Sequence, residues 1–365
     1  MEQVYVIDAL RTPIGKYGGS LSTMRPDDLL AMVIKTILNK NPSIDISAIE
    51  DVIAGAANQS GEDNRNVGRM AALLAGLPVT VAGSTVNRLC ASGLQAIMDA
   101  SRAIMCGDGD LYIACGVESM TRAPFVMPKT TTPFGREPQI YDTTLGWRFT
   151  NKKLAELYHP YTMGETAENV AKQWNISRHA QDKFAFDSQQ KYFAAQAENK
   201  FKDEILPVHV QIGKDLFEFD KDEHPRQTTF EKLSQLQPAF VKDGTVTAGN
   251  SSGINDGAAA IILANEKAVK KYGLTPMAKI VSMAVAGVDP AIMGIGPVAA
   301  TKKALERAGL TVADLDLIEL NEAFASQSIA CIHDLGLDLE KVNVNGGAIA
   351  LGHPLGCSGV RISTT

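Results

Sequence analysis

The feature that most restricts the fold is an alternation of strand-like and helix-like segments along the first third of the chain. The apolar stretch VYVIDAL begins at Val4, and PDDLLAMVIKTIL follows with Pro26 and two acidic residues in its first turn, as helix starts often have. The stretches IEDVIAGAA, residues 49–57, and LYIACG, residues 111–116, are again strand-like. Strands that alternate with helices pack as a parallel sheet covered by helices. We therefore expect an α/β fold.

The middle of the chain has a different character. Residues 120–249 are more polar, with the turn-rich PKTTTPFGREPQ and an amphipathic helix expected at about 177–200. The last third returns to alternation, with strand-like AKIVSMAVAG and LDLIELNEAF and a helix from Pro297 to a stop at Gly309. We expect an insertion between two halves, divided as residues 1–119 plus 250–268, the inserted loop domain 120–249, and a C-terminal half 269–365.

The two halves resemble each other at a fixed spacing. An offset of 266 residues separates Gly55 from Asn321, at the ends of two similar segments, and the same offset separates Ser92-Gly93 from Ser358-Gly359. Self-similarity at one spacing favours an internal duplication. By this correspondence the partner of the strand-like LYIACG would lie beyond the last residue, so we expect the C-terminal half to be truncated.

Composition excludes several classes of function. The 365 residues are 45% hydrophobic with a formal net charge of -6, which gives no electrostatic reason to expect nucleic acid as a partner. No apolar run approaches the ~20 residues that span a bilayer, and the N-terminus lacks a signal pattern, so we expect no membrane association and a cytoplasmic location. The five cysteines form no CxxC pair, which argues against a disulfide framework and against a metal site.

One cysteine lies at an unusual position. In TVNRLCASGLQA, residues 85–96, a β-branched lead-in meets Cys90 and then a helical pattern of apolar residues. Free cysteine is usually a small buried residue, so packing is the default interpretation. A thiol at a helix N-terminus, however, meets the positive end of the helix dipole, which lowers its pKa and favours the reactive thiolate. Cys90 is therefore a candidate nucleophile.

A cysteine nucleophile needs a base. Among six histidines, His353 differs because it lies in GHPLG, a glycine-rich loop with few competing side chains. The pair Asn321-Glu322 follows a strand-like segment, at the kind of edge where α/β sheets bind ligands, although Asn321 could equally cap the next helix. Four other histidines lie in the polar middle and are expected to be solvated: His159, His179, His209 and His224.

A serine provides an alternative nucleophile. GNSSG, residues 249–253, matches the G-x-S-x-G elbow and would make Ser251 the nucleophile of a serine hydrolase. That elbow needs a strand before it and a helix after it, whereas INDGAAAIILA follows here, with a glycine and then a strand-like run. The hydrolase is therefore the weaker hypothesis.

Five motifs in order carry a family resemblance: VNRLCASG, GVESMTRAP, TAGNSSGINDGAAA, LNEAFA and GGAIALGHPLGCSG. Together they resemble the thiolase family of acyl-CoA C-acyltransferases over essentially the whole chain. The resemblance implies αβαβα layers built from two similar halves with a loop domain inserted in the first. It also implies that Cys90 takes the acyl group, that His353 activates it and helps to hold the thioester oxygen, and that Asn321 orients a water in that oxyanion hole.

The resemblance also implies the ligands. Coenzyme A would be a co-substrate rather than a permanently bound cofactor, acyl-CoA the other substrate, and the protein a homodimer or homotetramer. Ser252 matches the family's pantetheine contact, Met163 and Phe240 match residues lining the acyl and pantetheine tunnel, and Arg226 matches the region that binds the adenine and phosphates.

The implied reaction has two steps. Cys90 would attack the C3 carbonyl of a 3-ketoacyl-CoA, acetyl-CoA would leave as its enolate, and free CoA would collect the acyl group, or the reverse condensation would run. In the family, a second cysteine in a C-x-G motif near the C-terminus moves the enolate proton. This motif is absent here, so we expect poor complete turnover while Cys90 can still be acylated. An inactive thiolase-fold protein is one alternative.

The substrate is suggested by two stretches, ANQSGEDNRNVGRMAALLAGLP and DTTLGWRF, which most resemble β-ketoadipyl-CoA thiolases of aromatic catabolism. Their acyl chain ends in a carboxylate, which would need a cation. A broader 3-ketoacyl-CoA or acetoacetyl-CoA thiolase is the second possibility. Four arginines in or near these stretches could bind the carboxylate or make ordinary ion pairs: Arg65, Arg69, Arg122 and Arg148.

Overall fold

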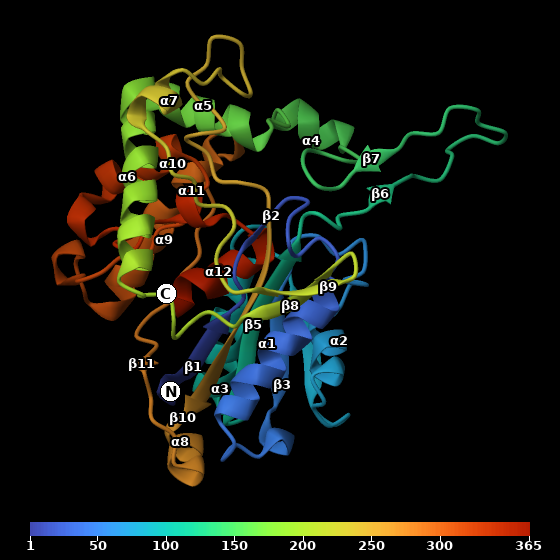
Figure 1. Cartoon of the computed structure of the whole chain (residues 1–365), viewed down its shortest axis with the longest axis vertical. Coiled ribbons are helices and arrows are strands. Elements are labelled where there is room, and N and C mark those ends of the chain that lie inside the picture. The colour runs from blue at the N-terminus through green and yellow to red at the C-terminus, as the bar shows by residue number, and fades with distance from the viewer.

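A central sheet organises the computed structural model, which describes residues 1–365 apart from the side chain of residue 212. The sheet order is β11-β1-β10-β5-β3-β4, with the short β2 paired to β10 (Figure 1). Strands β3, β4 and β5 are parallel, as the alternation predicts, whereas β10 runs antiparallel between β1 and β5. The sheet is therefore mixed. Its strands are β1 (Val4–Arg11), β2 (Gly15–Lys16), β3 (Asp51–Gly55), β4 (Ala82–Val86), β5 (Leu111–Ser119), β10 (Asn255–Asn265) and β11 (Ala278–Lys279).

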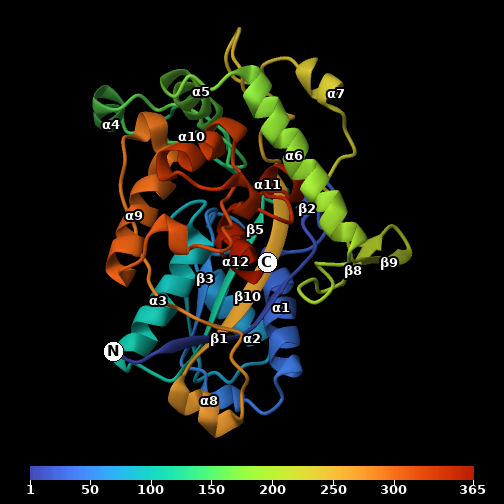
Figure 2. The same cartoon turned by 90° about the vertical axis from the view of Figure 1, so that its left-hand side faces the viewer.

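The sheet is covered on both faces, which explains why β5 and β10 are buried along their whole length. Successive residues of a strand point to opposite faces, so Ala260 packs with α1 and α2, while its neighbour Ile261 packs with α3 and α12. Figure 2 shows the sheet from the side, with these helices around it. The helices are α1 (Pro26–Lys40), α2 (Val67–Leu74), α3 (Ser92–Cys106) and α12 (Leu355–Thr364).

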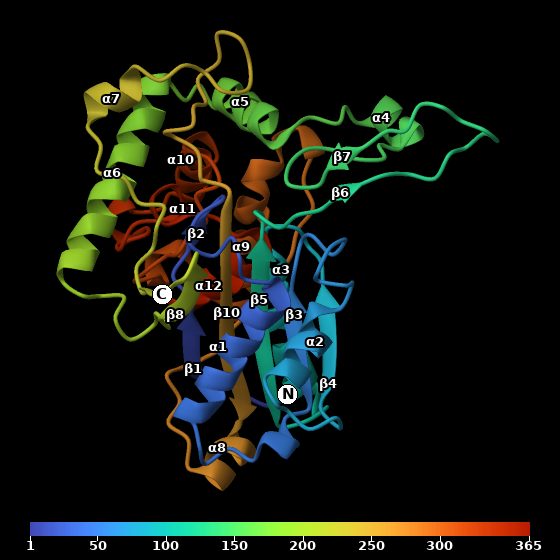
Figure 3. The ribbon, with the colours of Figure 1, turned by 45° about the vertical axis from the view of Figure 1, so that its right-hand side comes forward.

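Most of the polar middle of the chain forms the upper part of the molecule in Figure 1, whereas β8 and β9 lie lower, against the sheet region. The helix expected at about 177–200 is α6 (Arg178–Ala197), which begins after the capping residue Ser177. Residues around β6 and β7 project away from the sheet as an arm (Figure 3). The other elements here are β6 (Phe125–Val126), β7 (Tyr141–Asp142), α4 (Lys152–Leu157), α5 (Met163–Gln173), β8 (Val208–Ile212), β9 (Asp215–Phe219) and α7 (Phe230–Ser234).

A buried arginine ties this middle region to the sheet. Arg11, at the end of β1, is fully buried. Its guanidinium donates to both carboxylate oxygens of Asp222, at 2.7 and 3.0 Å, and to Glu204 at 2.6 Å. It also lies over the ring of Phe201, 5.5 Å from the centroid. Because a buried charge must be paired, this cluster holds the chain after α6 in a defined position.

The last third is mostly helical. The helix expected from Pro297 is α9 (Gly296–Ala308), and it ends at Gly309, whose φ of 68° is the left-handed conformation typical of a helix stop. The two strand-like segments expected here pair little: only β11 and two single bridges, Ile318 with Val342 and Phe324 with Ser251, form among the described residues. An extended segment becomes a strand only when a neighbour accepts its hydrogen bonds. The remaining helices are α8 (Glu266–Tyr272), α10 (Ala325–Leu335) and α11 (Ala348–Leu351), with 3-10 turns at 46–48, 290–295, 312–314 and 339–341.

Within the described part of the chain, we find no helix that is long and apolar enough to cross a bilayer.

Candidate active site

Cys90 lies in a tight turn between β4 and α3. The chain leaves β4 at Val86, and Leu89 then adopts a φ of 50°, which is uncommon for a residue with a side chain. The side-chain oxygen of Asn87 accepts a hydrogen bond from the Leu89 N–H at 2.9 Å and stabilises this turn. Helix α3 begins at Ser92, two residues after Cys90, so the thiol precedes the helix rather than forming its first residue. A strand, a strained turn and a helix together present Cys90 at partial exposure.

His353 is held from three directions in the loop before α12. Its backbone N–H donates to the side-chain oxygen of Asn255 at 2.9 Å. Its Nδ1 lies 2.6 Å from the hydroxyl oxygen of Ser358, and that hydroxyl donates its proton to the carbonyl of Pro354 at 2.9 Å. Since a hydroxyl has one proton, Nδ1 must be the donor to Ser358, and Nε2 carries the free lone pair.

The free Nε2 of His353 lies 3.4 Å from the side-chain nitrogen of Asn321, which can donate to it. The side-chain oxygen of Asn321 is buried and has no hydrogen-bond partner among the described residues. Asn321 does not cap α10, because the capping position belongs to Phe324. Its neighbour Glu322 is buried and accepts from Ser188 at 2.7 Å, as well as from Asn343 and the N–H of Ile349. The two adjacent residues therefore differ: Asn321 faces His353, and Glu322 fixes the surrounding loops.

Glycines bring α3 and α12 into close contact. A methyl group added at Gly359 would lie 2.0 Å from the backbone nitrogen of Leu94, and one at Gly93 would lie 2.7 Å from the carbonyl oxygen of Gly356. No side chain fits at such distances. The two Ser-Gly pairs that share the 266-residue offset thus mark the crossing of the helix that follows Cys90 and the helix that follows His353.

The pKa shifts of Cys90 and His353 favour the uncharged form of both side chains. Burial, with a smaller contribution from the nearby carboxylate of Glu118, raises the pKa of the Cys90 thiol to about 11. Burial, together with the charge of Arg361, lowers the pKa of His353 to about 4. The direction for Cys90 is opposite to the one expected from a helix start, since desolvation and the Glu118 charge both disfavour the thiolate. These shifts favour a neutral thiol at Cys90 and a neutral imidazole at His353.

The residues expected to contact coenzyme A form two groups. Met163 begins α5 and is 42% exposed, and the next residue, Gly164, packs against the ring of Phe240. That ring meets Phe324, from the motif of Asn321, edge to face at 6.0 Å between centroids. These apolar side chains therefore gather near Asn321.

Ser252 joins the same region through its backbone, which donates to the carbonyl of Ala323 at 3.0 Å. Arg226 is exposed, and only its backbone N–H is held, by Gln189 at 2.9 Å. The guanidinium of Arg226 is thus placed at the surface.

Several sequence-based interpretations are corrected. Ser251 lacks the strand–turn–helix setting of a hydrolase, and its hydroxyl donates to the carbonyl of Thr247 at 2.7 Å. His224 was expected to be solvated but is 93% buried, because the chain after β9 folds back against Gly253. Arg69 donates to the carbonyls of Val79 and Val81, and is thus structural.

Arg122 likewise pairs with Glu62 at 2.5 and 2.6 Å. Of the four arginines considered for an acyl carboxylate, Arg122 alone makes an ion pair among the described residues, and Arg69 is held by carbonyls. The side chains of Arg65 and Arg148 have neither kind of contact among the described residues. Cys90, His353 and Asn321 are the candidates that the sequence selects, whereas it does not single out Asn255 and Ser358, which contact His353 from within the family motifs. The motifs GINDG and GHPLGCSG, which contain Asn255 and Ser358, were the sequence signal that could have identified these two residues.

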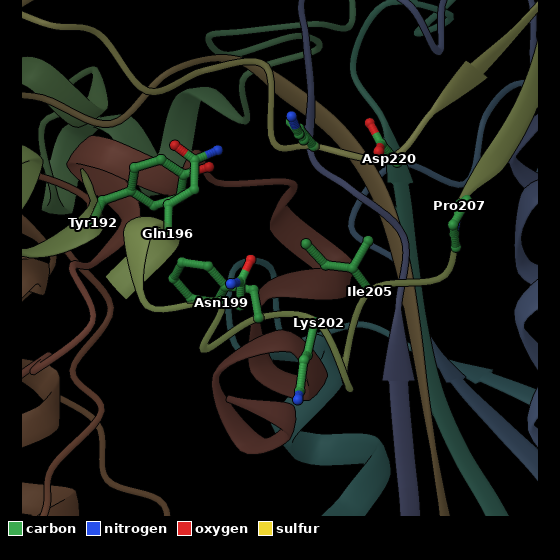
Figure 4. Close-up of a pocket in the computed structure, with 9 residues that line it drawn as sticks. Tyr192, Gln196, Asn199, Lys202, Ile205, Pro207 and Asp220 are labelled. Atoms are coloured by element: carbon green, nitrogen blue, oxygen red, sulfur yellow. The ribbon is translucent and has the colours of Figure 1, made fainter. Parts of the chain in front are cut away.

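A separate cleft of about 270 Å³ lies at the end of α6, far along the chain from these motifs (Figure 4). Polar side chains such as Asn199, Lys202 and Asp220 line it together with Tyr192 and Ile205. None of the expected site residues contributes to it. Among the described residues, no group of three or more metal-ligating side chains comes together.

The fold and site define an acyltransferase, and the chain belongs to the thiolase family. Residues 4–267 match the thiolase N-terminal domain, and residues 274–365 match the thiolase C-terminal domain. Thiolases use CoA as a substrate.

Particular relatives sharpen this assignment. The chain is 55% identical to the β-ketoadipyl-CoA thiolase of Escherichia coli, and the match covers 100% of this chain and 92% of that relative. It is 56% identical to the β-ketoadipyl-CoA thiolase of Pseudomonas aeruginosa, and this match covers 100% of this chain and 91% of that relative. Among solved structures, the Bacillus anthracis acetyl-CoA acetyltransferase superposes with a TM-score of 0.93 at 42% identity, covering 100% of this chain and 91% of that one. The human mitochondrial 3-ketoacyl-CoA thiolase in complex with CoA superposes with a TM-score of 0.91 at 42% identity, covering 100% and 90%.

Proposed function

We propose that this thiolase cleaves 3-oxoadipyl-CoA with CoA, giving acetyl-CoA and succinyl-CoA. The observation that carries the proposal is 54–56% identity, over the full chain, to relatives named as β-ketoadipyl-CoA thiolases. The half-buried Arg148, which makes no ion pair among the described residues, is the cation we propose for the terminal carboxylate, with Arg65 as the exposed alternative.

In the proposed mechanism, His353 takes the Cys90 proton at Nε2, the nitrogen left free by the bond between Nδ1 and Ser358. The thiolate attacks the C3 carbonyl of the substrate, the bond between C2 and C3 breaks, and acetyl-CoA leaves as its enolate, which takes up the proton held by His353. The thiol of CoA then gives its proton to His353 and attacks the acyl-Cys90 thioester. The shortened acyl-CoA is released, and Cys90 leaves as a thiolate that regains this proton. Asn321 fits the oxyanion role, since its side-chain amide lies beside Nε2 and its oxygen is free to hold a water.

We also propose how the ligand lies. Met163, Phe240 and Ser252 lie around the Asn321 motif, which supports pantetheine binding there, and the exposed guanidinium of Arg226 is available to the phosphates of CoA. The threefold division of the chain into an N-terminal half, the insertion 120–249 and a C-terminal half belongs to the same proposal.

The proposal also includes the oligomeric state of the protein and its cellular location. Large apolar side chains are exposed between β6 and β7 and on α4, where Phe134 is 97% and Leu157 75% exposed. Such exposed apolar surface is typical of an interaction site and supports a homo-oligomer, a dimer or a tetramer. The five cysteines are free thiols, as suits the reducing cytoplasm.

The test is acylation of Cys90. After mixing with 3-oxoadipyl-CoA, intact-protein mass spectrometry should show a succinyl adduct, and peptide mapping should place it on Cys90. Cys90→Ser should remove the adduct, whereas Cys106→Ser, which changes an exposed thiol, should retain it. Faster acylation by acetoacetyl-CoA than by 3-oxoadipyl-CoA would favour the broader thiolase. An adduct that persists in Cys90→Ser would refute the proposed nucleophile.

A further inference from the structure

Glu118 is a buried carboxylate that no step of the mechanism uses. It lies next to the last residue of β5 and is 1% exposed. Burying a carboxylate costs several kcal/mol unless hydrogen bonds compensate, so its partners indicate why the site needs it.

Both oxygens of Glu118 accept backbone hydrogen bonds. The N–H of Asn58 donates to one oxygen at 3.0 Å, and those of Ala57 and Gly356 donate to the other at 2.9 and 2.7 Å. Ala57 and Asn58 follow β3, whereas Gly356 is the second residue of α12. One carboxylate therefore joins a loop of the first half of the chain to the helix that follows His353.

The hydrogen bond between Glu118 and Gly356 is connected to the His353 imidazole through a few residues of α12. Gly356 lies two residues before Ser358, whose hydroxyl orients the ring of His353. A shift at the start of α12 would move that hydroxyl and would also alter the close approach of Gly356 to Gly93. The same carboxylate is also near enough to Cys90 to disfavour its thiolate.

We propose that Glu118 is a positioning residue for acyl transfer: its carboxylate holds the start of α12 on the loop after β3 and presents a negative charge to the Cys90 thiol. This inference rests on the proposed function, since acyl transfer through Cys90 is what Glu118 would support. In the resting enzyme the charge adds to burial in disfavouring the Cys90 thiolate, and the fixed helix holds the ring of His353 in its orientation.

Other charged groups face the same region. Burial raises the pKa of Glu118 to about 7, and Asp63 adds a smaller increase, so the carboxylate is charged above neutral pH. Cys357, on α12, has a pKa raised to about 12 by burial and remains a thiol. The charge of Arg361, also on α12, lowers the pKa of His353 and opposes the rise in the pKa of Cys357, whereas it does not change the pKa of Cys90.

The experiment compares Glu118→Gln with Glu118→Asp in the full chain. The rate of iodoacetamide labelling of Cys90 is followed from pH 7 to 11 by peptide mass spectrometry, and acylation by 3-oxoadipyl-CoA is followed at pH 8. Exposed Cys106 provides an internal reference for the reagent in every sample. Thermal melting confirms that each variant is folded.

For Glu118→Gln we expect opposite changes. Loss of the negative charge should lower the labelling midpoint of Cys90 by about one pH unit, which makes labelling about tenfold faster below the midpoint. The amide leaves one backbone N–H without an acceptor, so acylation should slow by about fivefold or more. Glu118→Asp keeps the charge and should label near the wild-type midpoint, but its shorter side chain should also slow acylation.

Two results would overturn the proposal: a Glu118→Gln midpoint equal to wild type, or equal shifts in both variants, as a merely structural role or partial unfolding would give. The two proposals fail separately. Absence of acylation in wild type would contradict the function proposed for Cys90, while the labelling comparison would still report the effect of the Glu118 charge.

Discussion

Replacing Ser358 with alanine is the sharpest test of the site geometry. The hydroxyl of Ser358 is buried, accepts from His353 Nδ1 at 2.6 Å and donates to Pro354 at 2.9 Å. Without it, the imidazole N–H has lost its partner in a buried position, which costs about 1–3 kcal/mol. The ring proton can then also move to Nε2, and a protonated Nε2 can no longer accept the proton of Cys90.

If that cost falls on the transition state, acylation should slow by about 5- to 150-fold. The assay is single-turnover acylation of Cys90 by 3-oxoadipyl-CoA, followed by quenching and intact mass. Ser363→Ala is the matched control, since this residue lies on the same helix and its hydroxyl donates to the Gly359 carbonyl at 2.9 Å without touching an imidazole. If Ser358→Ala acylates within twofold of Ser363→Ala, the assignment of the Nδ1 proton is wrong.

Three further outcomes follow from packing and charge. Asp222→Asn should lower the free energy of unfolding by about 3–5 kcal/mol, measured by urea denaturation, because the guanidinium of Arg11 loses a buried charged partner; no change would mean that Glu204 alone suffices. Gly359→Ala should melt at a clearly lower temperature, since its Cβ would lie 2.0 Å from a backbone nitrogen of α3, whereas Gly287→Ala, with open space around the added methyl, should not. The imidazole NMR signals of His353 should stay constant from pH 8 to 5.5, because folding lowers the pKa of His353 from 6.5 to about 4. The free energy of unfolding should therefore fall by up to about 3 kcal/mol as the pH drops from 6.5 to 4. An NMR titration midpoint near pH 6.5 would contradict the burial of the ring.

Local sequence determined the elements whose signals are local. Pro26 and the acids after it start α1, Ser177 caps α6, and Gly309 ends α9, because capping and left-handed turns depend on a few neighbouring residues. Motif spacing and family resemblance were enough to select Cys90, His353 and Asn321. The two Ser-Gly pairs indicated an internal duplication, and the structure adds that they lie where α3 and α12 cross.

Pairing and protonation depended on residues distant in sequence. The antiparallel placement of β10 between β1 and β5 follows from long-range hydrogen bonds that no short window encodes. The same applies to Glu118, which accepts from residues 60 and 238 positions away.

The α/β class, the main helices and the choice of candidate site residues thus follow from the sequence, because periodicity, caps and motifs are properties of neighbouring residues. Only the tertiary structure decided their chemistry. The position of Cys90 before a helix favours a thiolate, but burial and the charge of Glu118 raise the pKa of the thiol. Burial lowers the pKa of His353, and its bond to Ser358 leaves the lone pair on Nε2. Desolvation and hydrogen-bond partners depend on which distant segments surround a group, and that is settled only when the chain folds.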